Sequence, residues 1–182
     1  MIGILLLISL LLAFYEGARR GTALQFIHIM GFVVSLVVAT QSYESVGKKI
    51  ELYVPYMSVT SESKLAFFSQ PQSFNLDHTF YAAFAYIAIV FGGWLLTKFL
   101  AIFFAGLRFT KLFGKFDWIF SGVMNSILLY VMVFFIIFLA SLFPIDAVQA
   151  LFTKGSISYH IVKDSPVLSN YFYRIWVTNI IG

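Results

Sequence analysis

The residues best suited to chemistry lie inside an apolar segment, where polar side chains are unusual. They follow one another at alternating spacings of four and three, which is the spacing of one helical face: Gly21, Gln25, His28, Phe32, Ser35 and Ala39. A histidine on such a face could titrate, and with the glutamine and serine it could line a polar path through a membrane. The same side chains could instead hold helices together, with His28 neutral and hydrogen bonded. The sequence leaves both interpretations open.

Two further apolar segments also carry small or polar residues at helical spacing. These residues are Ala85, Ala88 and Gly92 in one segment, and Ser121, Gly122, Asn125 and Ser126 in the other. Small residues let two helix backbones approach closely, and serine or amide side chains can then hydrogen bond across the contact. We therefore expect Gly92 and Gly122 at close helix contacts, and Gln25 and Asn125 in bonds between helices.

No arrangement typical of an enzyme accompanies these residues. The chain has no cysteine, which excludes disulfides, thiol catalysis and cysteine-based metal sites. It also lacks an HExxH motif, a glycine-rich phosphate loop and a Ser, His and Asp set. Asp77 and His78 are expected to begin a helix rather than to form half of a site. We therefore predict no catalytic residue, no metal and no cofactor.

The composition predicts what positions these residues. Of 182 residues, 60% are hydrophobic and 11% are charged, whereas a soluble domain has roughly 45–50% and about 25%. That much apolar surface exceeds what a soluble core of this size can bury. The sequence therefore predicts an all-α integral membrane protein with four transmembrane helices plus amphipathic C-terminal helices.

The expected division of the chain follows its apolar segments. Residues 1–143 are predicted to form a four-span bundle with an outer loop at 41–77, and residues 144–182 to form an amphipathic tail on the outer surface. The four spans are predicted at about 1–18, 22–40, 79–107 and 119–143. The first segment lacks the basic start of a signal peptide, so it is interpreted as an uncleaved span. The third is too long for one upright span, so it either tilts or meets water at a snorkelling Lys98.

The tail contains a helix-start pattern and a group of aromatic residues. Ser165 is a plausible N-cap, and Pro166 suits the first position of a helix. Tyr171, Phe172, Tyr173 and Trp176 are expected to be exposed and to contact a lipid surface or another protein.

The basic residues predict an orientation. Arg19 and Arg20 lie in the first short link, and Arg108, Lys111 and Lys115 lie in the third. Positive charges in short links favour the cytoplasmic side, so both links are predicted inside, with the N-terminus and the tail outside. The basic residues are too dispersed to indicate nucleic-acid binding.

The order of these features resembles the colicin V production protein family, also called CvpA-like membrane proteins. Arg20-Gly21 matches the Arg-Gly pair that opens the second span of that family. The stretch "LFGKFDWIFSG", anchored by Gly114 and Gly122, loosely matches the junction into the fourth span. Met124-Asn125 stands where that family can carry a second Arg-Gly, so no role of that second arginine carries over.

The tail also resembles members of this family from Gram-positive bacteria of the lactic-acid type. The matching residues are Pro144, Gln149, Ser156, Ser165, Pro166, Val167, Leu168 and Ser169. The resemblance implies a bacterial plasma-membrane protein linked to toxin or bacteriocin production and to envelope homeostasis, without established catalytic residues.

Two functions follow as expectations. One is a non-catalytic accessory or scaffold protein that meets a secretion or envelope protein through its outer tail. The other is a small oligomeric transporter or channel, with the face of Gln25, His28 and Ser35 along a polar path.

Overall fold

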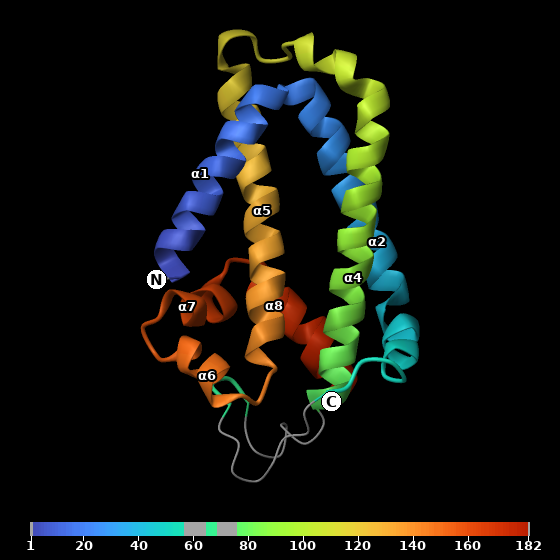
Figure 1. Ribbon diagram of the computed structural model, residues 1–182, viewed down its shortest axis with the longest axis vertical. Helices are drawn as coiled ribbons and strands as arrows, with labels where there is room; N and C mark the ends of the chain where they lie inside the picture. The colour runs from blue at the N-terminus through green and yellow to red at the C-terminus, as the bar shows by residue number, and fades with distance from the viewer. Residues whose placement is uncertain (1, 57–64, 69–75, 182) are drawn as a thin grey trace. The chain divides into compact units, whose positions relative to one another are not determined.

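The computed structural model describes residues 2–56, 65–68 and 76–181, and the described residues are helical with no strand (Figure 1). Within them, four helical segments are long and apolar enough to cross a membrane. The long elements are α1 (Ile2–Arg20), α2 (Thr22–Ile50), α4 (Leu76–Ala101) with the 3-10 helix η1 (Ile102–Phe109), and η2 (Gly114–Phe116) with α5 (Asp117–Ser141). Because lipid offers no hydrogen bonds to a backbone, apolar segments of this length satisfy their own polar groups as helices. The predicted all-α membrane protein is confirmed.

The contacts divide the chain into two units. Unit 1 comprises Met1–Thr40 and Ala88–Val133, and unit 2 comprises Gln41–Ile87 and Phe134–Gly182. The sequence placed its division elsewhere, after residue 143. It did not predict that the tail would group with residues 41–87.

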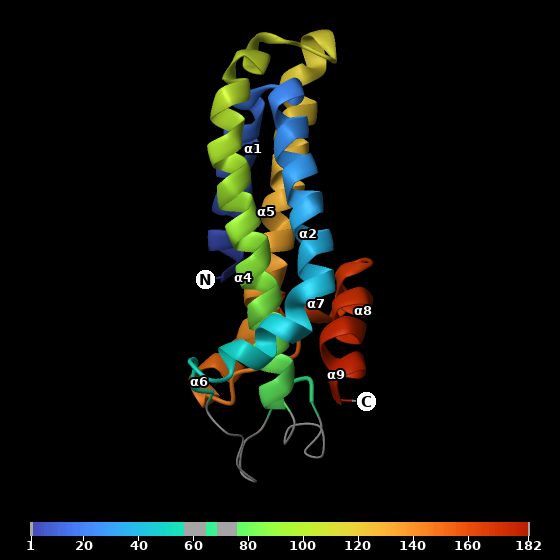
Figure 2. The same cartoon turned by 90° about the vertical axis from the view of Figure 1, so that its right-hand side faces the viewer.

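Unit 1 is built from close helix contacts at small residues. In the ribbon, α1 lies beside α5, and α2 lies beside α4 (Figures 1 and 2). A Cβ atom added to Gly17 of α1 would lie 2.6 Å from the Ser121 carbonyl oxygen of α5. A Cβ atom on Gly31 of α2 would lie 2.1 Å from Thr97 Oγ1 of α4. Neither approach is open to a larger residue, so the glycines set both distances.

Unit 2 is filled by aromatic side chains instead. One cluster of buried rings comes from α4, α5 and the C-terminal elements α8 (Leu168–Tyr173) and η4 (Arg174–Thr178), a π-helical turn. These rings are Tyr86, Phe134, Phe135, Phe138, Phe172 and Trp176. Their centroids lie 4.7 to 6.2 Å apart in the contacting pairs, within the range of favourable ring contacts.

Tyrosine hydroxyls tie the segments of unit 2 together. Tyr43 donates to the Ile175 carbonyl at 3.1 Å, and Tyr56 donates to the Leu142 carbonyl at 2.7 Å. The Tyr56 ring stacks on Phe80, with centroids 4.9 Å apart. Burial raises the pKa of Tyr56, so its hydroxyl stays protonated and keeps donating.

The second helix is longer than the sequence predicted. It continues to Ile50 instead of ending near Thr40, so residues 41–50 of the expected loop are helical. The reason is packing within unit 2, where Tyr43 is buried and Gly47 allows Tyr81 to approach closely. The rest of the expected loop lies partly outside the described residues, at 57–64 and 69–75.

The tail folds as several short helices, as predicted in kind. They are α6 (Asp146–Gln149), η3 (Ala150–Phe152), α7 (Ile157–Asp164), α8, η4 and α9 (Asn179–Ile181). The predicted start at Ser165 and Pro166 is wrong, because α8 begins at Leu168. The Ser165 hydroxyl instead donates back to the Ile161 carbonyl of α7 at 2.6 Å. Val167 adopts φ 65° and ψ −48°, and the Leu168 N–H donates to the Pro166 carbonyl at 2.7 Å, so a γ-turn separates the two helices.

Candidate functional site

The candidate site lies in unit 1, and it begins at the turn between α1 and α2. Gly21 makes this turn with φ 79°, a conformation that glycine adopts without strain. A Cβ atom here would lie 3.0 Å from the Arg108 carbonyl. The Arg108 side chain donates from Nε to the Arg19 carbonyl at 2.9 Å. The two basic links that the sequence predicted on one side of the membrane therefore contact each other.

A buried carboxylate fastens this contact. Asp117 Oδ2 accepts from the Thr22 backbone N–H at 3.0 Å, and the Thr22 hydroxyl donates to the Asp117 carbonyl at 2.9 Å. Asp117 Oδ1 accepts from the N–H groups of Leu112 and Phe113 at 2.9 and 3.3 Å. The carboxylate thus satisfies the free N–H at the start of α2, where the helix dipole also favours negative charge.

The polar residues next to the α1–α2 turn form a single hydrogen-bonded network. Arg20 donates from Nη1 to Gln25 Oε1 at 3.0 Å and to Asn125 Oδ1 at 3.3 Å. Its Nη2 pairs with Glu16. Gln25 Nε2 also donates to Asn125 Oδ1 at 3.3 Å. Arg20, Gln25 and Asn125 therefore join α1, α2 and α5, and the expected bonding of Gln25 and Asn125 between helices is confirmed.

Side chains of α5 extend this network along α1. Asn125 Nδ2 donates to the Ala13 carbonyl at 2.7 Å, and Ser121 donates to the Gly17 carbonyl at 2.6 Å. Ser126 donates to the Leu10 carbonyl at 3.3 Å. The predicted small residue Gly122 lies against Phe14, with an added Cβ 2.7 Å from its ring. Hydrogen bonds of this kind contribute roughly 0.6 kcal/mol each on average in membranes, so their number matters more than any one.

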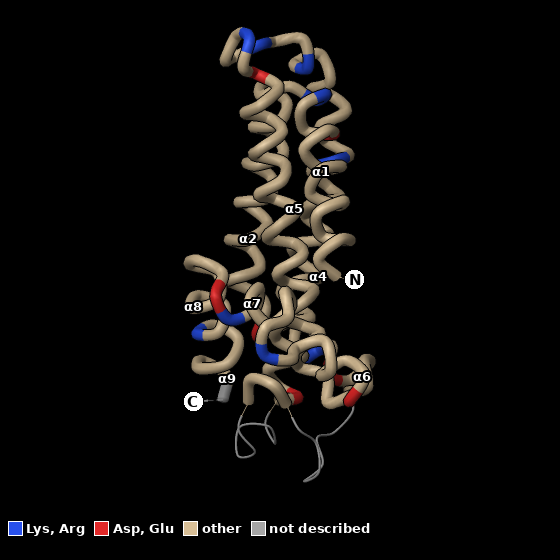
Figure 3. The backbone as a smooth tube through the Cα atoms, turned by 90° about the vertical axis from the view of Figure 1, so that its left-hand side faces the viewer, with Lys and Arg blue, Asp and Glu red and all other residues tan. Residues whose placement is uncertain are grey.

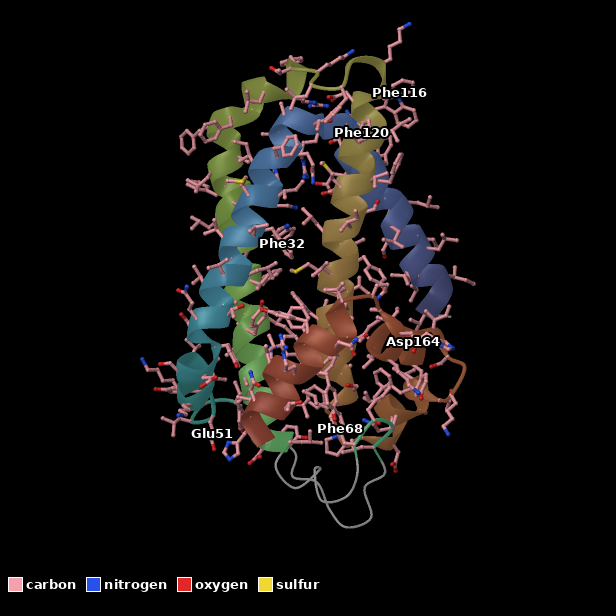
Figure 4. The ribbon with its side chains drawn as sticks, turned by 180° about the vertical axis from the view of Figure 1, so that it is seen from behind. Phe32, Glu51, Phe68, Phe116, Phe120 and Asp164 are labelled. Carbon is pink, nitrogen blue, oxygen red and sulfur yellow. The ribbon has the colours of Figure 1, made fainter. Side chains whose placement is uncertain are left out.

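The predicted polar face of α2 is buried, and its members His28 and Ser35 bond within the helix. Gln25, His28, Phe32, Ser35 and Ala39 are all under 9% exposed. The His28 Nδ1 donates to the Leu24 carbonyl at 3.0 Å, and Ser35 donates to the Gly31 carbonyl at 2.7 Å. Figure 4 labels Phe32 on this helix, among the side chains of unit 1.

A cavity of about 170 Å³ lies between the α1–α5 pair and the α2–α4 pair. Its polar lining comes from Glu16, Arg20, Lys98 and Asn125, and its apolar lining includes Phe32 and Met132. The Lys98 ammonium lies 4.1 Å from the centroid of the Trp94 ring, a distance typical of a cation–π contact. The cavity could admit water or a small ligand.

The close contact that the sequence predicted at Gly92 of α4 is made by the next residue, Gly93. A Cβ atom on Gly92 would meet nothing within 4 Å, whereas one on Gly93 would lie 2.1 Å from Ser35 Oγ. The expected packing role of Gly92 is wrong, because the face of α4 that meets α2 carries Gly93. Gly114 forms an open turn at φ 55° and makes no close contact.

The predicted exposed aromatic surface of the tail is only half present. Phe172 and Trp176 are 4% and 0% exposed and belong to the core of unit 2. Tyr171 and Tyr173 remain 37% exposed. Residues four positions apart lie on one helical face. Because the face that carries Phe172 and Trp176 packs inward, both rings are buried.

Sequence reasoning missed Asp117, Gly17 and Gly93. Asp117 carries one signal, since an acidic residue just before a long apolar run suits a helix start. The glycines of α1 and α4 give no signal about which partner approaches them. Among the residues described, no group of three or more His, Cys, Asp or Glu could hold a metal ion.

Charged residues mark the end of unit 1 that carries the turns. In Figure 3, Lys and Arg positions gather at the α1–α2 turn and at the segment between α4 and α5. Another cavity of about 240 Å³ is lined there by Arg19, Arg108, Lys111 and Lys115.

Comparisons with known proteins add the following findings. A family model described as colicin V production protein matches residues 2–166. A protein described as uncharacterized transmembrane protein YshB, from Bacillus subtilis (strain 168), is 25% identical over 177 residues. The alignment covers 97% of this chain and 97% of that relative. No solved structure matches.

Proposed function

Because the chain belongs to the colicin V production protein family, we propose that it is a non-catalytic accessory or scaffold protein of the bacterial plasma membrane. In this role it supports the production or export of a toxin or bacteriocin and the homeostasis of the envelope. It acts by holding a helical platform for other membrane or envelope proteins rather than by chemistry of its own.

One observation carries this proposal, namely that the polar side chains of unit 1 bond to one another and to helix backbones. Arg20, Gln25 and Asn125 form one network across three helices. His28 and Ser35 bond to carbonyls of their own helix. Bonds between helices stabilise helix packing, which is what a scaffold requires, whereas the bonds of His28 and Ser35 engage these side chains within α2.

The proposed partner is a secretion or envelope protein that contacts the tail, with a second copy of the chain as the alternative. The exposed rings of Tyr171 and Tyr173 favour such a contact, because tyrosine is enriched at protein interfaces. No nucleic acid is expected, since the basic residues lie at membrane links.

The experiment is a clean deletion in the native host, complemented with the wild-type gene. A secreted bacteriocin-type peptide is quantified inside and outside the cells, together with leakage of a membrane-impermeant dye. Peptide retained inside cells with an intact envelope supports the export role, and leakage with normal export supports envelope maintenance. Normal export with an intact envelope in the deletion strain would contradict both roles.

The cavity between the helix pairs favours a second candidate, a small transporter or channel. Its polar lining includes Lys98, Arg20 and Glu16, and charged groups at membrane depth often mark substrate or ion paths. Purified protein in liposomes would then conduct a small ion, and flux would change on Lys98→Gln or His28→Ala. Absence of flux from protein that restores the deletion strain would exclude this candidate.

We also propose that the α1–α2 turn and the α4–α5 link face the cytoplasm, with the tail outside. The basic residues Arg19, Arg108 and Lys111 support this orientation through the positive-inside tendency. The cysteine-free chain allows single-cysteine labelling against a silent background. An impermeant thiol reagent on intact cells should label Lys154→Cys but not Lys111→Cys, and the reverse pattern would overturn the orientation.

A further inference from the structure

The cavity at the turn end of unit 1 has a strongly one-sided charge. Arg19, Arg108, Lys111 and Lys115 line about 240 Å³ of space, together with the single carboxylate of Asp117. Four cations and one anion leave the lining with a surplus of positive charge. Low-dielectric surroundings strengthen the field of such a surplus on any anion that enters.

The one carboxylate at this cavity already has hydrogen-bond donors of its own. Asp117 accepts hydrogen bonds from the N–H groups of Thr22, Leu112 and Phe113. Lys111 and Lys115 are exposed, and in the described part of the chain neither forms an ion pair. Arg108 is held in place through its Nε bond to the Arg19 carbonyl. The cavity therefore combines one fixed guanidinium with two ammonium groups that lack a counter-ion.

Exposed aromatic side chains lie close in sequence to the basic residues, and two of them, Phe109 and Trp118, line the cavity with them. Phe109 is 85% exposed, and Phe116, Trp118 and Phe120 are 62%, 51% and 46% exposed. Phe116 is the last residue of η2, and Phe120 lies in the first turn of α5 (Figure 4). Aromatic side chains of this kind are enriched where a membrane meets water. These apolar side chains would not contribute to binding a soluble anion, whereas a lipid presents an anionic head group and apolar chains together.

We propose that this cavity is a binding site for the head group of an anionic phospholipid. The lipid phosphate lies among Arg108, Lys111 and Lys115, and the acyl chains run along the exposed rings of Phe109 and Trp118. Basic pockets at the ends of membrane helices recognise anionic head groups in this way. The site is independent of the proposed function. It is also independent of the orientation, because it requires only that the leaflet that the turn faces contains anionic lipid.

The test uses the full chain purified in a neutral detergent and native mass spectrometry to titrate retained lipid. The probes are phosphatidylglycerol and phosphatidylethanolamine with the same acyl chains. The test variant is Lys111→Gln/Lys115→Gln, whose lysines bond to no other described residue. The matched control is Lys48→Gln/Lys49→Gln, which removes two exposed lysines at the end of α2. Thermal unfolding confirms that each variant is folded.

The expected result is tighter retention of phosphatidylglycerol than of phosphatidylethanolamine by the wild type and by the control. The Lys111→Gln/Lys115→Gln variant should lose about ten- to thirty-fold in affinity for phosphatidylglycerol, which corresponds to roughly three- to fivefold per lysine. Equal retention by the two variants would overturn the proposal. Displacement of the lipid by excess inorganic phosphate would also overturn it, because the site would then be one for a soluble anion.

Discussion

The two units of this chain are filled in opposite ways. Unit 1 brings helices together at glycines such as Gly17 and Gly31 and bonds them through Arg20, Gln25 and Asn125. Unit 2 fills its interior with large rings that include Tyr86, Phe135 and Trp176. Small residues let helix backbones approach closely enough for hydrogen bonds between helices, whereas large rings fill the interior with side-chain contacts. Replacing a contact glycine by a larger residue should therefore destabilise unit 1, and truncating a buried ring should destabilise unit 2.

The largest effect should come from Trp176→Ala in unit 2. The side chain is fully buried, so its loss leaves a cavity among the rings of Tyr86, Phe135, Phe138 and Phe172 and should lower the free energy of unfolding by about 3–5 kcal/mol. Denaturation by sodium dodecyl sulfate, followed by circular dichroism, measures this. Trp118→Ala is the control, because that ring is 51% exposed. An equal loss in the control would refute the idea that buried rings support unit 2.

The next effect should come from Asp117→Ala in unit 1. The change leaves the N–H groups of Thr22, Leu112 and Phe113 without their acceptor, and should cost about 1.5–3 kcal/mol. Asp146→Ala, at an exposed acidic residue in the first turn of α6, should cost much less. Limited proteolysis should also become faster at residues 108–116 in Asp117→Ala. Unchanged stability and proteolysis would mean that the carboxylate does not fasten the turns.

Enlarging a contact glycine should have a similar or slightly smaller effect. Gly17→Val places new atoms where even a Cβ lies 2.6 Å from Asn125 Cβ, and overpacking of this kind costs about 1–3 kcal/mol. Gly92→Val is the matched change, since an added Cβ meets nothing within 4 Å. Thermal unfolding in detergent should separate the two variants. Equal melting temperatures would contradict the close approach of α1 and α5.

The smallest effect should come from Arg20→Lys. A lysine keeps the charge but cannot donate to Gln25, Asn125 and Glu16 with the planar geometry of arginine. The loss should be about 0.6–1.7 kcal/mol, the range of single hydrogen bonds between membrane helices. Arg19→Lys is the control, because within the described part of the chain the Arg19 side chain interacts with the ring and hydroxyl of Tyr15 and does not bond to another helix. If both changes have the same effect, charge alone suffices at position 20.

The fold class could be predicted because it depends on composition and segment length. Four long apolar segments separated by charged links predict a helical membrane protein, because a helix satisfies its own backbone hydrogen bonds in lipid. The end of α2 could not be predicted, because residues 41–50 become helical through Tyr43 and Gly47, which pack against parts of unit 2 far away in the sequence. Composition alone does not reveal such a partner.

The candidate site was partly predictable for the same reason. The helical spacing of Gln25, His28 and Ser35 correctly identified a buried face, and Asn125 was correctly expected to bond between helices. The choice between Gly92 and Gly93 depends on a rotation of α4 that its almost uniformly apolar sequence does not fix. Asp117 was missed because its partners Thr22 and Leu112 are brought together only by the fold.

The most direct test of the scaffold role concerns the two groups that a conduit needs and a scaffold does not. His28→Ala and Lys98→Gln remove the titratable ring and the cavity ammonium but leave the Arg20, Gln25 and Asn125 network in place. Each variant is expressed in the deletion strain, its membrane abundance is measured, and the secreted peptide is quantified. The account predicts secretion equal to that of the wild type at equal abundance. Loss of secretion at normal abundance would contradict it and favour a polar path through unit 1.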